Sequence, residues 1–184
     1  KSDLTGVAIS IGPGSFTGLR IGLATAKMLS YALSIPVVAV SSLEAMAYHY
    51  PVPSVYVASV LDAQKSNAYF ALYEWNGKGF DEKKQTCVMD FEEVVKYCST
   101  LDKPVVFVGD IAQKKADIIA QYENVSLGLP HLCMPRASNV AMAAKVRFEN
   151  EDYDNIMDLE PVYIRRSEAE VLWEKRHGEK LTDL

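Results

Sequence analysis

The sequence is poor in cysteine, in long apolar runs and in basic residues, and each shortage excludes a class of protein. Its 184 residues include three cysteines, Cys87, Cys98 and Cys133, which are far apart and form no Cys-x-x-Cys pair. This spacing is typical of reduced thiols and not of a disulfide framework. No apolar run approaches the roughly 20 residues that span a bilayer. We therefore expect a cytoplasmic protein that does not insert into a membrane.

The chain has no excess of positive charge. Lysine and arginine number 19 against 24 acidic residues, which gives a formal net charge of −5. A protein that holds a nucleic acid by itself usually carries a basic face, because the neutralisation of phosphates supplies much of the affinity. We therefore do not expect this chain to bind RNA or DNA directly.

Recognisable catalytic motifs are also missing from the sequence. The three histidines, His49, His131 and His177, do not form the i, i+4 pair that holds a metal ion on a helix. The sequence contains neither a Gly-x-Ser-x-Gly nucleophile elbow nor a Walker A loop. From these absences we predict no catalytic residue, no metal ligand and no tightly bound cofactor.

Strand and helix signals alternate along the chain, which is the pattern of a layered α/β protein. Ser41 and Glu44 have the spacing of a capping box at a helix start, and Pro51 and Pro53 mark a boundary between two lobes. The expected strands cover 7–11, 36–40, 55–61, 68–75 and 104–108, and the expected helices cover about 16–33, 41–48, 91–98, 110–122 and 138–148. We predict a first lobe over 1–50, a second lobe over 51–150 and a C-terminal segment over 151–184, in which Glu168 to Leu184 form a surface helix or a frayed tail.

The most specific segment is a glycine turn between the first expected strand and the first expected helix, Gly12-Pro13-Gly14-Ser15. Such a turn directs free backbone amides and the positive end of the helix dipole at one spot. Two interpretations stay open. In one, an anion or nucleotide phosphate lies near Gly12, Pro13, Gly14, Ser15 and Thr17. In the other, the turn is structural and Ser15 or Thr17 caps the helix.

Small residues recur every four positions in that helix, at Gly18, Gly22, Ala26 and Ser30, and so form a groove on one face. Two interior glycines cost a helix about 2 kcal/mol relative to alanine, so we expect another backbone to approach closely. Two interpretations stay open here too: the chain's own sheet and a neighbouring helix bury the helix, or one face meets a second subunit. The second interpretation predicts a partner interface made of Gly18, Leu19, Arg20, Ile21, Gly22, Leu23, Thr25, Ala26, Lys27 and Ser30, with Arg20 and Lys27 at its rim.

These residues carry a resemblance to a known family. The run from Gly12 to Gly22, followed by Ala24, Ala26 and Lys27, resembles the signature of the TsaB (YeaZ) family of tRNA threonylcarbamoyladenosine synthesis. Weaker similarity continues at Val38–Leu43, Asp62-Ala63, Gly109-Asp110, Pro135-Arg136-Ala137 and Pro161–Arg165. The family normally opens with a strand carrying Ile-Asp-Thr-Ser and two further strands. None of them is in this sequence, so the resemblance implies that the first strands of the first lobe are missing.

The resemblance implies an ASKHA fold, with two RNase H-like lobes of the actin, Hsp70 and sugar-kinase type. It implies a non-catalytic paralogue of TsaD, the subunit that transfers threonylcarbamoyl to adenosine 37 of ANN-decoding tRNAs. On this basis the chain binds and activates TsaD through the helix after the glycine turn, pairs with itself when TsaD is absent, and contacts tRNA only indirectly. TsaE is the further partner implied, with ATP or ADP bound only at a joint site with the partner.

Two rival functions stay open at this point. Asp62 and Asp110 each end an expected strand, where an ASKHA phosphotransferase or ATPase places its phosphate and metal ligands, although aspartate is also a favoured turn residue. The other rival is a glycoprotease-like peptidase, a label that relatives of the family have carried, for which Ser15 is the nucleophile to test.

Overall fold

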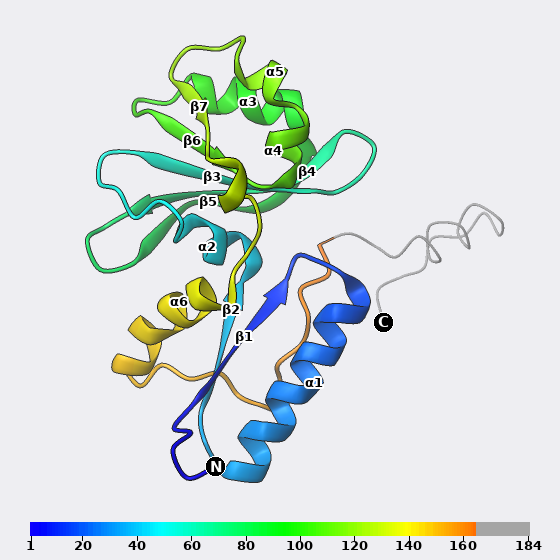
Figure 1. The fold of residues 1–184 in the computed structure, drawn as a ribbon, viewed down its shortest axis with the longest axis vertical. Helices are drawn as coiled ribbons and strands as arrows, with labels where there is room; N and C mark the ends of the chain where they lie inside the picture. The colour runs from blue at the N-terminus through cyan, green and yellow to red at the C-terminus, as the bar shows by residue number, and fades with distance from the viewer. Residues whose placement is uncertain (165–184) are drawn as a thin grey trace, which may run out of the picture.

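A computed structural model describes residues 1–164 of the chain, in two lobes that each contain a separate β-sheet (Figure 1). The predicted surface helix or tail over Glu168–Leu184, and Arg165 of the family motif, lie outside the described residues. Within residues 1–164, no helix is both long and apolar enough to cross a bilayer.

The first lobe is built on a two-stranded parallel sheet of β1 (Val7–Gly12) and β2 (Val37–Ser41). Helix α1 (Phe16–Leu33) covers one face of this sheet, with Leu23 packed against Val37. Helices α2 (Ser42–Ala47) and α6 (Ala137–Glu149) cover the other face. Burial of both faces explains why β2 is a continuous apolar run in the sequence.

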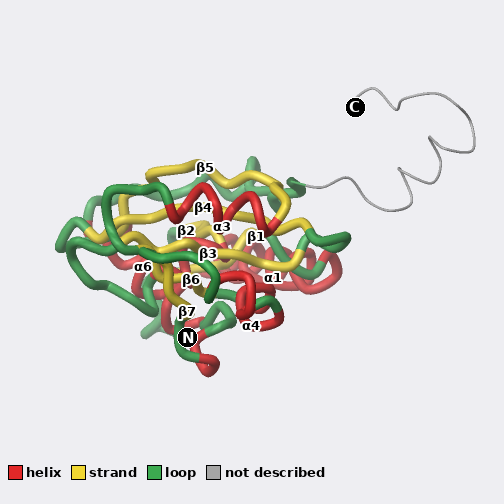
Figure 2. The backbone as a smooth tube through the Cα atoms, turned by 90° about the horizontal axis from the view of Figure 1, so that it is seen from above, coloured by secondary structure: helices red, strands yellow, loops and turns green. Residues whose placement is uncertain are grey.

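The second lobe contains a five-stranded sheet in the order β5-β4-β3-β6-β7, which can be followed strand by strand in Figure 2. Its strands are β3 (Tyr56–Asp62), β4 (Asn67–Trp75), β5 (Phe80–Asp90), β6 (Val105–Val108) and β7 (Val125–Leu127). Helices α3 (Phe91–Ser99), α4 (Asp110–Lys114) and α5 (Ala116–Ile119) pack on one face of it, around Phe70, Phe91 and Phe107. Helix α2 covers the other face through Leu43 and Met46, so α2 lies between the two sheets.

Two stretches of chain connect the lobes, over residues 48–55 and 128–136. The second stretch contains a short 3-10 helix, η1 (Pro130–Leu132). Hydrogen bonds join the two stretches to each other: Nε2 of His49 lies 3.0 Å from the carbonyl oxygen of Met134, and the amide of Leu129 donates to the hydroxyl of Tyr50 at 2.7 Å. The amide nitrogen of the Asn139 side chain, on α6, lies 3.1 Å from Nδ1 of His49. His49 therefore holds both connections and α6 together.

The structure confirms the α/β class and the first two strands and helices, but it corrects other predictions. The second lobe does not extend to residue 150, because α6 packs its Val140 and Ala144 on Val38 and Val40 of the first lobe. The helix expected over 110–122 is two short helices. Strands β5 and β7 were not expected. Strand β5 is an edge strand with charged side chains, so it lacks the apolar alternation that identifies a half-buried strand.

Ser41 caps α2, but the capping box with Glu44 is not formed within residues 1–164. The Ser41 hydroxyl accepts a hydrogen bond from the amide of Leu43 at 3.2 Å, whereas the motif predicts the amide of Glu44 as the donor. The reciprocal bond from the Ser41 amide to Glu44 is not present among the described residues; the Glu44 side chain lines a pocket instead.

Candidate functional site

The glycine turn is a structural cap. Ser15 is the N-cap residue of α1, and its hydroxyl accepts the amide of Gly18 at 3.4 Å, which confirms the capping interpretation for Ser15. Gly12 and Pro13 are buried, whereas Gly14, Ser15 and Thr17 are exposed. The amide of Val162 donates to the carbonyl of Ile11 at 2.8 Å, so the C-terminal segment runs beside the turn. An anion site in the turn stays an untested prediction.

The small-residue stripe of α1 faces the chain's own sheet. Ala26 is 3 % exposed and Ser30 is 6 % exposed, and the Ser30 hydroxyl donates to the carbonyl of Ile35 at 2.6 Å. A Cβ atom added to Gly22 would lie 3.3 Å from Cδ1 of Ile9 on β1. The prediction that this stripe is open to a second subunit is wrong for Gly22, Ala26 and Ser30, because these small residues let α1 lie close to β1.

Leu23 is also buried in that contact, whereas Gly18 is exposed and Leu19 is half-buried. The predicted interface residues are therefore divided between two faces of the helix. Of that set, only Gly18, Arg20, Ile21 and Thr25 lie on the exposed side.

The opposite side of α1 exposes a row of large apolar residues. Ile21, Met28 and Tyr31 are 64 %, 63 % and 71 % exposed. We call this surface the outer face of α1 and define it by Phe16, Ile21, Ala24, Thr25, Met28, Leu29 and Tyr31, all of them exposed. Contiguous apolar surface of this kind usually marks a binding site. The spacing of 21, 24, 28 and 31 is the sequence signal for this face, but it competes with the equally regular small-residue stripe.

Arg20 and Lys27 bind the C-terminal segment and are not free charges at a rim. Nε of Arg20 donates to the Tyr163 hydroxyl at 2.8 Å, and its guanidinium lies 4.0 Å from the centre of the Phe16 ring. Nζ of Lys27 donates to the carbonyl of Leu159 at 3.0 Å. The segment from 155 to 164 therefore lies along α1, as the orange ribbon in Figure 1 shows, and sequence reasoning missed this contact because the partners are far apart in the chain.

Asp62 and Asp110 come together at the ends of the parallel strands β3 and β6. The amide of Asp62 donates to a carboxylate oxygen of Asp110 at 3.0 Å. Lys114 forms ion pairs with both carboxylates, at 2.9 Å and 3.3 Å, and its hydrogen bond holds the pKa of Asp62 below the usual range. Glycine at position 109 allows the backbone before Asp110 to lie this close to β3. Its φ is 138°, and a Cβ atom there would overlap the Val60 carbonyl.

The environment of the two aspartates favours the turn role over ligation. The amide of Gln64 donates to Asp62 at 2.8 Å, which is the bond of an Asx turn. Lys114 occupies the place between the two carboxylates. Within residues 1–164, no three His, Cys, Asp or Glu side chains are grouped so that they could hold a metal ion.

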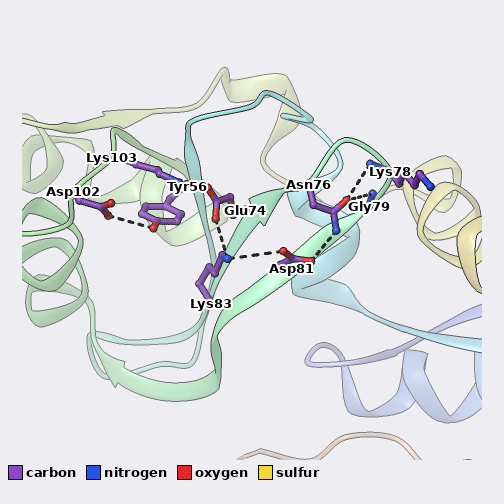
Figure 3. A network of polar contacts seen from close by, with 9 residues as sticks. All are labelled: Tyr56, Glu74, Asn76, Lys78, Gly79, Asp81, Lys83, Asp102 and Lys103. Atoms are coloured by element: carbon purple, nitrogen blue, oxygen red, sulfur yellow. Dashed lines mark hydrogen bonds and ion pairs between the residues drawn. The ribbon is translucent and has the colours of Figure 1, made fainter.

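A polar network crosses the second sheet (Figure 3). Glu74 on β4 is paired with Lys83 at 2.9 Å and with Lys103, and hydrogen bonds from these two lysines, Lys103 first, lower the pKa of the Glu74 carboxyl. At the hairpin between β4 and β5, the Asn76 side chain accepts the amide of Gly79 at 2.9 Å and donates to Asp81 at 2.7 Å. The network fixes the position of this hairpin, whose tip reaches toward α2 and α6.

The chain is similar in sequence to known proteins over most of its length. The family model for TsaD, described as tRNA N6-adenosine threonylcarbamoyltransferase, matches residues 1–173. A Bacillus subtilis protein named tRNA threonylcarbamoyladenosine biosynthesis protein TsaB is 32 % identical over 178 residues, which are 93 % of this chain and 74 % of the relative. The Escherichia coli protein of the same name is 28 % identical over 182 residues, 97 % of this chain and 77 % of the relative.

A solved structure supports the fold. YeaZ from Pseudomonas aeruginosa superposes with a TM-score of 0.73 at 24 % identity, over 88 % of this chain and 74 % of that one. The chain therefore has the mixed α/β architecture of the YeaZ structures, and the ASKHA-like class inferred from the sequence is confirmed.

Proposed function

Because the chain belongs to the TsaB (YeaZ) family, we propose that it acts in tRNA threonylcarbamoyladenosine biosynthesis as a non-catalytic subunit that binds and activates TsaD. TsaD then transfers the threonylcarbamoyl group to adenosine 37 of ANN-decoding tRNAs. The names of the relatives support the pathway. The division of labour within the pathway is our proposal.

The observation that carries the proposal is the outer face of α1. An 18-residue helix that exposes Ile21, Met28 and Tyr31 presents apolar side chains where a lone protein would place polar ones. Another helix packing on this row would bury these side chains at about 25 cal/mol per Å² of apolar area. TsaD is the partner we assign to this face, with a second copy of the chain as its occupant when TsaD is absent.

The arrangement of Asp62, Asp110 and Lys114 supports a role without catalysis. A phosphotransferase needs carboxylates that are free to hold a metal ion, whereas these two are paired with one lysine. Ser15 caps α1 and has the partner expected of a cap, which argues against its use as a nucleophile. We assign ATP or ADP to a joint site with the partner, TsaE to the same assembly, and tRNA to indirect contact.

Reconstitution tests this proposal. The chain, TsaD, TsaE, the threonylcarbamoyl donor and an ANN-decoding tRNA are combined, each protein is omitted in turn, and modified nucleosides are measured by mass spectrometry. We expect modification to need this chain and TsaD together. Modification that is complete without the chain, or robust ATP hydrolysis by the chain alone, would contradict the proposal.

A matched pair of variants tests the surface. Met28 on α1 and Met142 on α6 are both exposed methionines on helices, at 63 % and 54 %. We expect Met28→Asp to weaken binding to TsaD at least about tenfold, which is the effect of about 1.4 kcal/mol, and Met142→Asp to leave it unchanged. If TsaD bound the two variants with equal affinity, the outer face of α1 would not be part of the interface with TsaD.

A further inference from the structure

A pocket of about 460 Å³ lies where the two lobes meet, on the opposite side of the first sheet from α1. Three elements form its walls: α2, the hairpin between β4 and β5, and α6. Neither the glycine turn nor the outer face of α1 contributes to it. The pocket therefore needs an explanation separate from partner binding.

Among residues 1–164, Glu44 is the only acidic residue that lines this pocket. Its carboxylate makes no hydrogen bond and no ion pair within residues 1–164, and burial raises the pKa of this carboxyl above its usual value. The Glu44 side chain is half-buried, so its carboxylate has lost part of its hydration, and no donor within residues 1–164 replaces the lost water. The side chain is thus held in a place where a cation would stabilise it.

Two basic residues, Lys78 and Arg147, line the pocket, and the guanidinium of Arg147 is already paired. Arg147 on α6 lines the same pocket, but its Nε donates to Asp152 at 2.7 Å and its Nη1 donates to Asp154 at 2.9 Å. Two carboxylates therefore neutralise one guanidinium. The charge of Arg147 still lowers the pKa of Glu44 and the charge of Glu82 raises it, the effect of Arg147 being the larger of the two, but burial outweighs Arg147 and leaves the pKa raised.

Aromatic rings form another part of the wall. Tyr48 and Phe80 both line the pocket, with their ring centres 5.0 Å apart in an edge-on arrangement. Burial, with the charge of Glu44, raises the pKa of Tyr48 to about 12, so its ring is neutral at physiological pH. The faces of neutral aromatic rings attract organic cations, with about 0.5–2 kcal/mol per contact.

We propose that this pocket binds a small organic cation carrying an ammonium or guanidinium group, with the Glu44 carboxylate as its ion-pair partner and the Tyr48 and Phe80 rings against its carbon chain. The ligand contacts elements of both lobes, so its binding stabilises the folded state and raises the thermal midpoint. This inference does not depend on TsaD and can fail or hold independently of the proposed function.

Agmatine is a suitable probe, because one end is a guanidinium and the other an ammonium. We expect saturable binding to the chain, measured by isothermal titration and by a rise in the thermal midpoint. Glu44→Gln keeps the side-chain shape and removes the charge, and it should weaken binding at least about tenfold. The matched control is Glu92→Gln, at an exposed glutamate in the first turn of α3, which should bind as the original chain does.

A second variant fills the pocket and leaves the charge of Glu44 unchanged. A Cβ atom at Gly79 would lie 3.5 Å from the Tyr48 hydroxyl and 4.0 Å from Cγ2 of Val146, so Gly79→Leu places a side chain in the pocket. Binding should be lost while circular dichroism stays native. Agmatine binding that is absent from the original chain, or is equal in Glu44→Gln, overturns the proposal. Binding that appears only in Lys78→Ala overturns it too, because the chain's own Lys78 would then be the cation in the pocket.

Discussion

A Cβ atom on Gly22 would lie 3.3 Å from the Cδ1 atom of Ile9, which is closer than ordinary side-chain contact. Helix α1 therefore rests on strand β1 at this residue. Of the two interpretations of the small-residue stripe, the structure supports packing on the chain's own sheet, which leaves the outer face of α1 for other contacts.

Gly22→Leu should accordingly destabilise the chain itself. Overpacking a close contact costs about 1–3 kcal/mol, to be measured as a loss in the free energy of unfolding in urea. The control is Gly18→Ala, because a Cβ there meets only Ser15 at 3.5 Å and alanine favours the helix by about 1 kcal/mol. An unchanged unfolding midpoint for Gly22→Leu would mean that α1 does not rest on β1.

Lys27→Met should release the C-terminal segment from α1. The lysine Nζ donates to the carbonyls of Leu159 and Met157, at 3.0 Å and 3.5 Å, and methionine keeps the chain length without the donor. We expect faster amide hydrogen exchange over residues 157–164. Lys145→Met is the control, since the ion pair of Lys145 in the described part of the chain is with Glu149 on the surface of α6. Equal exchange in the two variants would contradict this role for Lys27.

Two buried serines should respond in opposite directions to alanine. The Ser59 hydroxyl, on β3, is fully buried and has no hydrogen-bond partner in the described part of the chain, so Ser59→Ala should be neutral or stabilising by about 1 kcal/mol. The Ser42 hydroxyl lies 2.7 Å from that of Ser10, so Ser42→Ala should be destabilising by about 1 kcal/mol. Chemical unfolding measures the free energy of unfolding of both variants. A destabilised Ser59→Ala would contradict the conclusion that the Ser59 hydroxyl has no hydrogen-bond partner.

Glu44→Gln should change how stability depends on pH. Burial raises the pKa of Glu44 in the folded state, so the folded chain binds a proton more tightly than the unfolded chain does. The free energy of unfolding then decreases as the pH rises from the pKa of Glu44 in the unfolded chain, about 4.5, through its raised pKa in the folded chain. The variant should be more stable than the original chain at neutral pH and should lose that advantage in acid. Thermal midpoints measured from acid to neutral pH, with Glu92→Gln beside them, test this expectation.

Cys98 should resist alkylation in the folded chain. It lies on the buried face of α3, and burial raises its pKa to about 12, so the reactive thiolate is scarce. Cys87 and Cys133 are half-buried and should react first with iodoacetamide, as peptide mass spectrometry can show. Equal labelling of all three thiols without denaturant would contradict the burial of Cys98.

Helix α1 also shows what sequence reasoning can and cannot predict. Its length and its cap at Ser15 follow from periodicity and turn chemistry. Which face of α1 packs on the sheet does not follow from the sequence, because the stripe at Gly22 and the row at Ile21 and Met28 are equally regular. Only the position of β1 decides which of the two is buried. Likewise, the convergence of Asp62 and Asp110 follows from their places at strand ends, whereas the Lys114 pairs and the Lys27 contacts depend on chain segments that meet only in the folded molecule.

The two stretches that join the lobes are bonded to each other at His49 and Tyr50. Helix α2 packs on both sheets, so the lobes are held together both by this helix and by the bonds between their connections. The side chain of His49 takes part in two of those bonds, one with Met134 and one with Asn139. A substitution at His49 would therefore loosen the junction between the lobes without altering a residue of either sheet.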